Sequence, residues 1–330
     1  MNASTKNYRN NHIDYLKGIT IILVVFGHCW LTSHELRWLI YRFHMPLFFC
    51  ISRYLFKNID NYYTFVTKKF KTLLIPYIIF FILSYIISKL FLNNILSIQH
   101  MIIYLYLNGK YCTQVNNWAL WYLPLFFVSN NCFYFITKIK KQKILFYILL
   151  ILFFITVPVN LFLQKITLDS YIPFTLQTLI PSLFFMLIGY LYKINLNKIK
   201  NKLNKNTLLK SFSLLIIGIF ISIKNSDQII DIRTYQYIIT ALLIIQFIIT
   251  YTKNKTNKLI CYLGKNTLII LGFHRIILFL FEYYFKPILI KINLHLGSII
   301  ITTLCISIIC ILKEIVIKSK KLLLSFCQKV

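Results

Sequence analysis

The first apolar stretch of the chain runs Asp14-Tyr-Leu-Lys17-Gly-Ile-Thr-Ile-Ile-Leu-Val-Val-Phe-Gly-His28. An ionisable side chain inside a membrane segment is expensive, and it is retained where it faces other helices or a water-filled cavity. On an ideal helix, the interval from Lys17 to His28 makes three turns plus about 20°, so both side chains lie on one face about 16 Å apart. Asp14 lies one turn before Lys17 on nearly the same face. The stretch therefore predicts a helix whose polar face lines the interior of a membrane protein.

Apolar runs of similar length recur along the whole chain. Of its 330 residues, 58% are hydrophobic, and a bilayer span requires about 20 mostly apolar residues. Such segments are helices by default, because a backbone exposed to lipid must satisfy its own hydrogen bonds. The sequence predicts an all-α, polytopic membrane helix bundle that forms one domain over residues 1–330. The ten predicted membrane segments are 18–33, 38–56, 72–92, 118–136, 144–163, 172–192, 208–223, 235–251, 266–285 and 296–317.

The positive charges indicate how these segments are oriented. If the N-terminus is cytoplasmic, lysine clusters such as 138–143, 193–205 and 253–265 all fall on the inner side of the membrane. Cytoplasmic loops carry an excess of lysine and arginine, so this bias predicts that both termini are cytoplasmic. We expect the first segment to be retained as a membrane helix, because no signal-peptide cleavage site follows it. The N-terminal Lys6 and Arg9 also fall on the inner side. The predicted outer loops, of which the longest spans about 93–117, hold only Arg37, Lys110, Lys165, Lys224, Arg233, Lys286 and Lys291.

The net charge of +29 has the same topological explanation. No basic stripe with interleaved aromatic residues lies outside the apolar runs, so we expect no nucleic-acid partner. Anionic lipid headgroups are the expected partners of the loop lysines. The eight cysteines form no CxxC pair, and most fall in apolar runs. We expect them to act as small hydrophobic residues, with neither a disulfide framework nor a metal site.

The histidine of the first segment has the chemistry of a general base. Imidazole accepts a proton near neutral pH, which makes His28 a candidate catalytic residue. A neutral histidine hydrogen-bonded between helices is the alternative interpretation. For Lys17 and Asp14, the alternative is an ion pair at the membrane interface, with the lysine extended toward the headgroups.

Further ionisable residues follow in the second and third segments. His44 is predicted near the outer boundary of the membrane and Arg53 near the inner one. Arg53 either reaches the lipid headgroups or contacts the anionic part of a phosphorylated donor. The cluster Lys68, Lys69 and Lys71 precedes the third segment, where it marks either the inner face of the membrane or a second contact with such a donor.

Aromatic and basic residues also mark later segments. Three aromatic residues, Trp118, Trp121 and Tyr122, lie where a segment begins. They form either an interfacial aromatic belt or a platform for a sugar ring. His274 and Arg275 lie inside the ninth segment, and Glu282 follows on roughly the same face. We expect a structural pairing of Arg275 with Glu282, either direct or through a third group.

Taken together, these motifs resemble those of acyltransferase family 3, a family of integral membrane proteins, and particularly its fucose 4-O-acetylase-like branch. The matching stretches are Ile13-Asp14-Tyr-Leu-Lys17-Gly-Ile through Gly27-His28, Phe43-His44-Met45-Pro46 with Ser52 after it, Lys68-Lys69-Phe-Lys71 before Pro76, Leu120-Trp121-Tyr122-Leu-Pro124, and Leu263-Gly264-Lys-Asn266-Thr267-Leu through His274. They occur in family order across about residues 12–274.

This resemblance implies that the protein transfers acyl groups from acyl-CoA to carbohydrate at a membrane. It implies that His28 matches the essential histidine of the family and that Lys17 matches a basic position usually held by arginine. Lys68 and Lys71 match a basic pair thought to meet the donor. The chain departs from the family pattern at Arg53, where glycine is usual, and in using lysine at the basic positions.

The sequence thus predicts a multi-pass O-acyltransferase of the cell membrane. Acetyl would pass from acetyl-CoA, a substrate rather than a resident cofactor, to a hydroxyl of a cell-surface or secreted polysaccharide or its lipid-linked precursor. Two alternatives remain: a polysaccharide or lipid transporter with His28 and Arg275 along its pathway, and an inactive scaffold of the same fold. The predicted site consists of a catalytic group (Asp14, Lys17 and His28), a donor-binding group (Arg53, Lys68, Lys69 and Lys71) and an acceptor-binding group (His44, Trp121, Tyr122 and His274).

Overall fold

The structure is a computed structural model that describes residues 11–56, 61–92, 97–107, 115–166, 172–195, 205–224, 233–253, 255–289 and 294–327. Within these ranges the fold contains helices and no strand, so the predicted all-α class is confirmed. The helices are α1 (Asn11–His28), α2 (His34–Tyr54), α3 (Tyr62–Lys69), η1 (Phe70–Leu74), α4 (Ile75–Leu92), α5 (Ile98–Leu107), η3 (Trp118–Trp121), α6 (Tyr122–Ile136), α7 (Gln142–Lys165), η5 (Pro173–Thr178), α8 (Leu179–Ile194), α10 (Lys205–Lys224), α11 (Tyr235–Thr252), α12 (Lys258–Lys265), α13 (Thr267–Leu289) and α14 (Leu294–Cys327).

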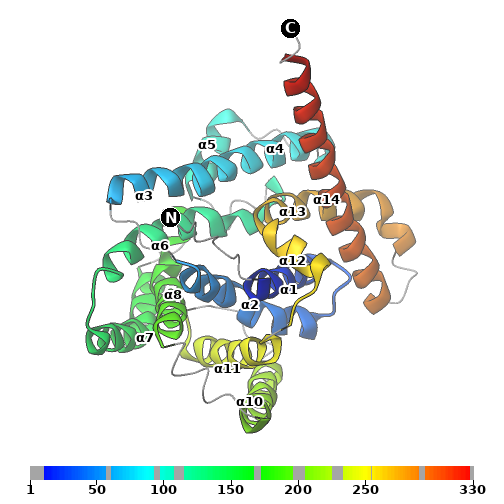
Figure 1. The fold of residues 1–330 in the computed structure, drawn as a ribbon. Coiled ribbons are helices and arrows are strands. Elements are labelled where there is room, and N and C mark those ends of the chain that lie inside the picture. Colours follow the sequence, from blue (N-terminus) through cyan, green and yellow to red (C-terminus); the bar gives the residue numbers. More distant parts are fainter. Residues whose placement is uncertain are drawn as a thin grey trace, which may run out of the picture.

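Helices α1 and α2 occupy the centre of the bundle (Figure 1). Helix α1 packs against α2, α11, α12, α13 and α14, while α2 also packs against α8 and α10. Asp14 is buried, and Lys17 and His28 are only partly exposed. The polar face of α1 therefore lies inside the bundle, as the sequence predicts, where other helices rather than lipid surround its ionisable groups.

Seven helices in the described ranges are long and apolar enough to cross a membrane. They are Tyr62–Phe91, Trp118–Ile136, Gln142–Lys165, Pro173–Ile194, Tyr235–Thr252, Thr267–Lys286 and His295–Ser319. Each of the ten predicted segments falls on a helix, but α1, α2 and α10 are absent from these seven. Both α1 and α2 are polar for a membrane helix because they carry the buried ionisable residues. Ten spans therefore remain a prediction.

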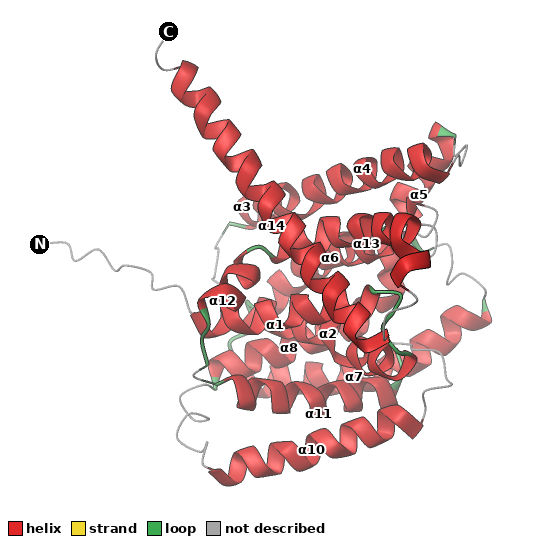
Figure 2. Ribbon diagram, turned by 90° about the vertical axis from the view of Figure 1, so that its right-hand side faces the viewer, coloured by secondary structure: helices red, strands yellow, loops and turns green. Residues whose placement is uncertain are grey.

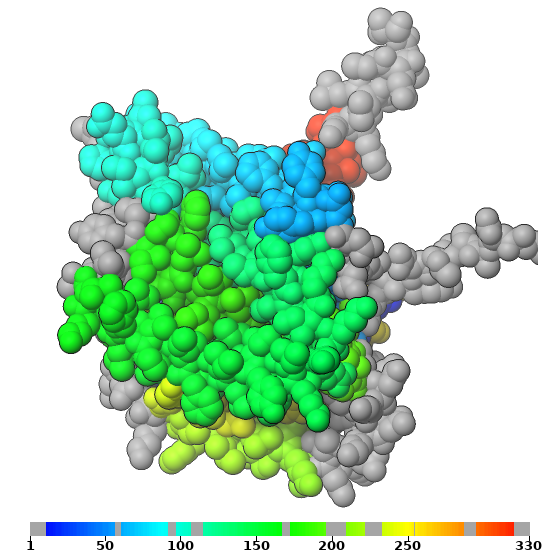
Figure 3. All heavy atoms as spheres, turned by 90° about the vertical axis from the view of Figure 1, so that its left-hand side faces the viewer, coloured from blue at the N-terminus to red at the C-terminus, as the bar shows by residue number. Residues whose placement is uncertain are grey.

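The outer helices have the apolar surface that lipid requires. Exposed aromatic and aliphatic side chains run along α7, including Phe146, Ile151 and Phe154, which are 54%, 60% and 61% exposed. Figure 3 shows the face that α7 forms with α6 and α3–α5. A contiguous apolar face of this kind indicates contact with membrane.

The two ends of the chain's helical part lie on one side of the bundle. The first turn of α1 and the last turns of α14 both point to the left in Figure 2. This arrangement agrees with termini on the same side of a membrane, and their cytoplasmic orientation remains a prediction. Lys6, Arg9 and residues 93–96 and 108–114 of the predicted outer loop at 93–117 lie outside the described residues.

Two local features differ from the sequence-based expectation. The predicted outer loop contains a ten-residue helix, α5. The ninth segment is preceded by a separate short helix, α12, whose last residue is Lys265 and whose C-cap is Asn266. The predicted start of the ninth segment at residue 266 agrees with the start of α13 at Thr267. Helix α12 was not predicted, because a helix of eight residues is too short to stand out as an apolar run.

Helix α12 approaches α1 so closely that only glycine fits at the contact. A Cβ atom on Gly264 would lie 1.8 Å from the carbonyl oxygen of Asp14, and one on Gly18 would lie 2.0 Å from that of Ile260. A similar contact joins α8 to α2, where a Cβ on Gly189 would lie 2.0 Å from the oxygen of Cys50. Small residues allow membrane helices to pack backbone to backbone. These contacts fix the position of α1 along α12 and that of α2 along α8.

We predict that Gly264→Ala prevents correct packing, because its Cβ collides with backbone that has no room to move. Fluorescence-detected size-exclusion chromatography in detergent should show loss of the monodisperse peak or a marked fall in melting temperature. The matched control is Gly218→Ala on α10, whose nearest neighbour is a side-chain atom of Ile244 at 3.3 Å. Equal stability of the two variants would refute the close packing of α12 on α1.

Candidate active site

A cluster of ring side chains surrounds His28 at the end of α1. The centroid of its imidazole lies 5.2 Å from that of His274 on α13, 5.4 Å from Tyr41 on α2, and 6.1 Å from Trp118 at the start of η3. His44 lies next to the Tyr41 ring at 5.4 Å. Four elements that are distant in sequence thus bring three histidines, a tyrosine and a tryptophan to one place.

The cluster forms where it does because α1 ends inside the protein. The last carbonyl groups of a helix have no partner within the helix and must find donors elsewhere. Tyr41 Oη donates to Gly27 O at 3.0 Å, and Arg275 Nη1 donates to His28 O at 3.0 Å. Arg37 Nη2 lies 3.1–3.3 Å from the next carbonyls, those of Cys29, Trp30 and Thr32. The negative pole of the helix dipole at this end also stabilises the two guanidinium cations, those of Arg37 and Arg275.

The hydrogen bonds of Tyr41 determine which nitrogen of His28 is basic. Tyr41 Oη lies 2.8 Å from His28 Nδ1 and 3.0 Å from Gly27 O. Because the carbonyl oxygen can only accept, we assign the single proton of the hydroxyl to the bond with Gly27 O. The Nδ1 atom must then carry a proton and donate it to the tyrosine oxygen. The lone pair of neutral His28 is therefore on Nε2, which has no hydrogen-bond partner in the described part of the chain. Nε2 is the atom that can accept a proton.

The other two histidines have the same tautomer by similar reasoning. His44 Nδ1 lies 2.8 Å from Ile40 O, and His274 Nδ1 lies 2.9 Å from Leu271 O. A carbonyl oxygen only accepts, so each Nδ1 donates and each Nε2 carries a lone pair. His274 Nε2 is buried without a partner among the described residues. The three imidazoles are therefore all poised as proton acceptors.

A cavity of about 280 Å³ lies along the same central helices. Lys17 and Lys69 contribute positive charge to its wall, and apolar side chains form most of the rest. The lining residues are Lys17, Ile21, Met45, Phe48, Ile51, Ser52, Leu55, Lys69, Leu73, Tyr122, Leu123, Phe126, Thr267, Leu268 and Leu271. The cavity can hold a ligand with an anionic group at one part and an apolar portion at another.

The cavity and the histidine cluster lie on neighbouring turns of the same helices. Ile21 lies two turns before His28 on α1, and Leu271 lies one turn before His274 on α13, intervals of about 10 Å and 5 Å along the helices. Met45 directly follows His44 on α2. The same three helices therefore line the cavity and carry the histidines.

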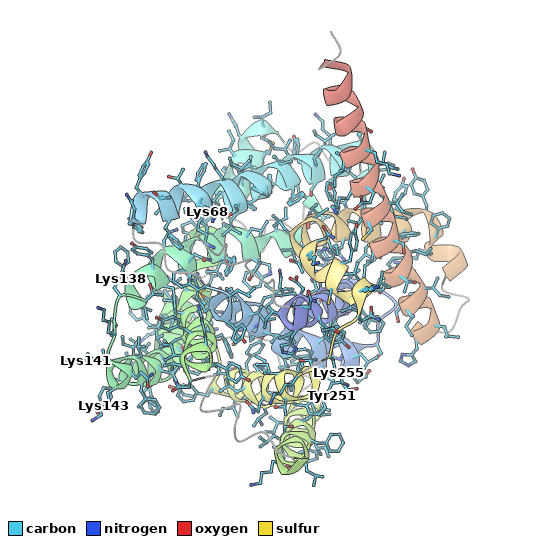
Figure 4. The ribbon with its side chains drawn as sticks, in the orientation of Figure 1. Lys68, Lys138, Lys141, Lys143, Tyr251 and Lys255 are labelled. Atoms are coloured by element: carbon cyan, nitrogen blue, oxygen red, sulfur yellow. The ribbon has the colours of Figure 1, made fainter. Side chains whose placement is uncertain are left out.

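The predicted donor residues occupy different environments. Lys69 lines the cavity, whereas Lys68 and Lys71 are exposed, and Lys68 lies on the α3–α4 segment in Figure 4. Arg53 is 1% exposed and lies behind the cavity wall. Its guanidinium donates to Asn130 Oδ1 and packs 4.8 Å from the ring centroids of Phe56 and Phe133.

The predicted acceptor-binding residues also fall into two places, the histidine cluster and the region of the cavity. His44 and His274 belong to the cluster around His28, while Tyr122 lines the cavity and contacts Phe126 in a stacked arrangement. Trp121 packs edge-on against Tyr122. In the predicted catalytic group, Lys17 Nζ lies 4.0 Å from Asp14 Oδ1, which is the distance of a loose ion pair.

Sequence reasoning missed Tyr41, and it noted Trp118 as a boundary aromatic without placing it beside His28. It expected Arg275 to pair with Glu282, but Glu282 instead lies 3.4 Å from Lys286. The Arg275 guanidinium lies 3.5 Å above the indole of Trp118 and bonds to the His28 carbonyl. One feature of the sequence could have pointed to Tyr41. Like Arg37 and Arg275, it is a strong hydrogen-bond donor that lies close in sequence to one of the three histidines.

Comparison with known proteins identifies a family for this chain. A family model described as an acyltransferase domain, family 3, matches residues 10–312. The chain belongs to acyltransferase family 3. The match includes α1, the cavity and the whole histidine cluster, and it supports a membrane acyltransferase in general terms. Neither the curated proteins nor the solved structures include a match to this chain.

We predict that Tyr41→Phe lowers acyl-transfer turnover by about tenfold or more, because His28 Nδ1 loses the acceptor that fixes its tautomer. The ring and its packing are kept, so the variant should reach the membrane in normal amounts. Turnover per folded molecule is the measurement. Tyr190→Phe, on α8 away from the cluster, is the matched control. Equal turnover of Tyr41→Phe and wild type would contradict the tautomer assignment.

Proposed function

We propose that this protein transfers an acetyl group from acetyl-CoA to a hydroxyl group of a cell-surface or secreted polysaccharide, or of its lipid-linked precursor. The observation that carries the proposal is the alignment of a lysine-lined cavity with three histidines on the same helices. The cavity suits a donor with an anionic part and a long thin arm, and the cluster offers the base that hydroxyl attack requires.

The proposed donor site is the cavity beside α1. Coenzyme A carries phosphates at one end and the acyl thioester at the end of a flexible arm. Lys17 and Lys69 would hold the phosphates, and buried Arg53 would add positive charge from behind the wall. The apolar walls, among them Ile21 and Leu271, would contact the arm. Lysine offers a point charge to phosphate rather than a bidentate fork.

The proposed reaction is a direct transfer at His28. Its Nε2 would take the proton from the acceptor hydroxyl while the hydroxyl oxygen attacks the thioester carbonyl carbon. The new C–O bond forms, the C–S bond breaks, and the coenzyme A thiolate receives the proton back from Nε2. Tyr41 would hold the imidazole in the productive orientation throughout.

The proposed acceptor reaches the cluster from the opposite side of the membrane. Trp118 provides a flat apolar face beside His28, and sugar rings pack their C–H faces on such surfaces. Trp121, Tyr122, His44 and His274 remain the acceptor residues proposed from the sequence. With both termini in the cytoplasm, α1 would run from the donor side at Asn11 to the acceptor side at His28, and the protein would act in the cell membrane.

His28→Gln tests the proposal directly. We expect this variant to abolish acetyl transfer while its membrane level and melting temperature remain near those of wild type. The assay follows labelled acetyl from acetyl-CoA into glycan in membranes of expressing cells. Transport of glycan without acetyl-CoA consumption would instead identify a transporter. A wild-type protein that does neither would identify an inactive scaffold.

Lys69→Gln tests the donor site. Because its ammonium lines the cavity, we expect its loss to raise the KM for acetyl-CoA by about tenfold, as for one lost charge-assisted contact, with little change in kcat. Lys143→Gln is the matched control, since Lys143 is exposed at the edge of the bundle near the turn between α6 and α7 (Figure 4). An unchanged KM for Lys69→Gln would place the donor elsewhere.

A further inference from the structure

The guanidinium of Arg275 is a buried cation beside the proposed catalytic base. The residue is 6% exposed, and no carboxylate among the described residues lies within 4 Å of it. It is held by the carbonyl of His28 at 3.0 Å and by the face of Trp118 at 3.5 Å. Its Nε is buried and without a partner in the described part of the chain.

A buried charge without a counter-ion is unfavourable, so its retention needs a reason. A carbonyl dipole and an aromatic face compensate it only in part. Capping α1 alone does not require a charge at this place, because Tyr41 caps the preceding carbonyl with a neutral hydroxyl. A function that uses the positive charge is therefore the stronger explanation.

Acyl transfer from a thioester creates negative charge close to the base. When the hydroxyl oxygen attacks, the thioester carbonyl oxygen becomes an oxyanion in the tetrahedral intermediate. A pre-positioned donor in a site sheltered from water stabilises such an oxyanion far more than it stabilises the neutral carbonyl. The His28 imidazole and the Arg275 guanidinium both contact the same indole, that of Trp118, and the guanidinium also bonds to the His28 carbonyl. A reacting carbon beside this indole would therefore have both the base and the cation close to it.

We infer that Arg275 is a catalytic residue that stabilises the oxyanion of the tetrahedral intermediate, through Nε–H or its free Nη–H groups. The inference rests on the proposed function, in which His28 is the base. It gives a role in stabilising the oxyanion to a residue for which the sequence predicted a structural pairing with Glu282 or, in the transporter alternative, a place along the pathway. The charged groups facing Arg275 are Arg37 from α2 and Glu282 from its own helix, at longer range.

The test compares Arg275→Gln with Arg275→Lys. Glutamine keeps an N–H donor for the His28 carbonyl but removes the charge, while lysine keeps the charge. For Arg275→Gln we expect kcat with acetyl-CoA to fall by about a hundredfold or more, and the Kd for acetyl-CoA to stay within about twofold. Arg275→Lys should retain substantially more turnover than Arg275→Gln. Melting temperature and chromatographic profile report on folding for each variant.

Arg42→Gln is the matched control. Arg42 on α2 is likewise a buried arginine, 3% exposed, but its guanidinium packs 4.7 Å from the ring centroid of Trp38, outside the cluster around His28. We expect this variant to lose thermal stability while keeping kcat per folded molecule.

Three results would overturn the inference. One is an Arg275→Gln variant with wild-type kcat, and another is a pair of variants, Gln and Lys, that lose kcat equally. The third is a rise in the KM for the glycan alone, which would make Arg275 a contact for an anionic acceptor.

If His28→Gln remains active or wild type consumes no acetyl-CoA, the proposed function itself fails. If wild type and His28→Gln behave as expected, these results dismiss only the role of Arg275.

Discussion

The termination of α1 inside the protein is the constraint on which the site depends. A helix that ends among other helices exposes carbonyl groups that neither water nor lipid satisfies, so each requires a donor from the fold. Tyr41 and Arg37 on α2 and Arg275 on α13 provide those donors. The same three residues fix the distance between their helices and α1. The side chains that satisfy the backbone of α1 are therefore the ones that hold the neighbouring helices around His28.

Close glycine contacts complete this framework. Gly18 and Gly264 bring the backbones of α1 and α12 together, and Gly189 does the same for α8 against α2. Because backbone contacts have no side-chain freedom, α1 cannot slide along its axis without collision. The depth of His28 relative to the cavity is thereby set by main-chain packing at the opposite end of the helix.

The sequence was sufficient for the fold class and for the direction in which the polar face of α1 points. Apolar length predicted helices at all ten segments, and helical periodicity placed Asp14, Lys17 and His28 on one buried face. Periodicity describes one helix at a time, however, and contacts between helices escaped it. It could not distinguish Lys69, which faces the cavity, from Lys68 and Lys71, which do not. A five-residue π-helix, η1, begins directly after Lys69, and such a wide turn changes which side chains share a face.

The position of Arg275 could not be predicted for a related reason. Spacing along α13 made Glu282 its natural partner, whereas the structure gives it a carbonyl and an indole from two other elements. Likewise Trp118 and Trp121 are equivalent in sequence as boundary aromatics. Only the three-dimensional arrangement shows that Trp118 contacts His28 and Trp121 contacts Tyr122.

The interval between Lys17 and His28 sets the distance that a donor bound at Lys17 has to span. The two residues are separated by about 16 Å of rigid helix, and the glycine contacts prevent that length from changing. A donor anchored by its charge at Lys17 can present an acyl carbon to His28 only if an arm of comparable length connects the two. Small activated acyl compounds, such as acyl phosphates, carry charge and acyl carbon within a few bonds of each other. The length of one helix would therefore discriminate between classes of acyl donor without any contact to the acyl group itself.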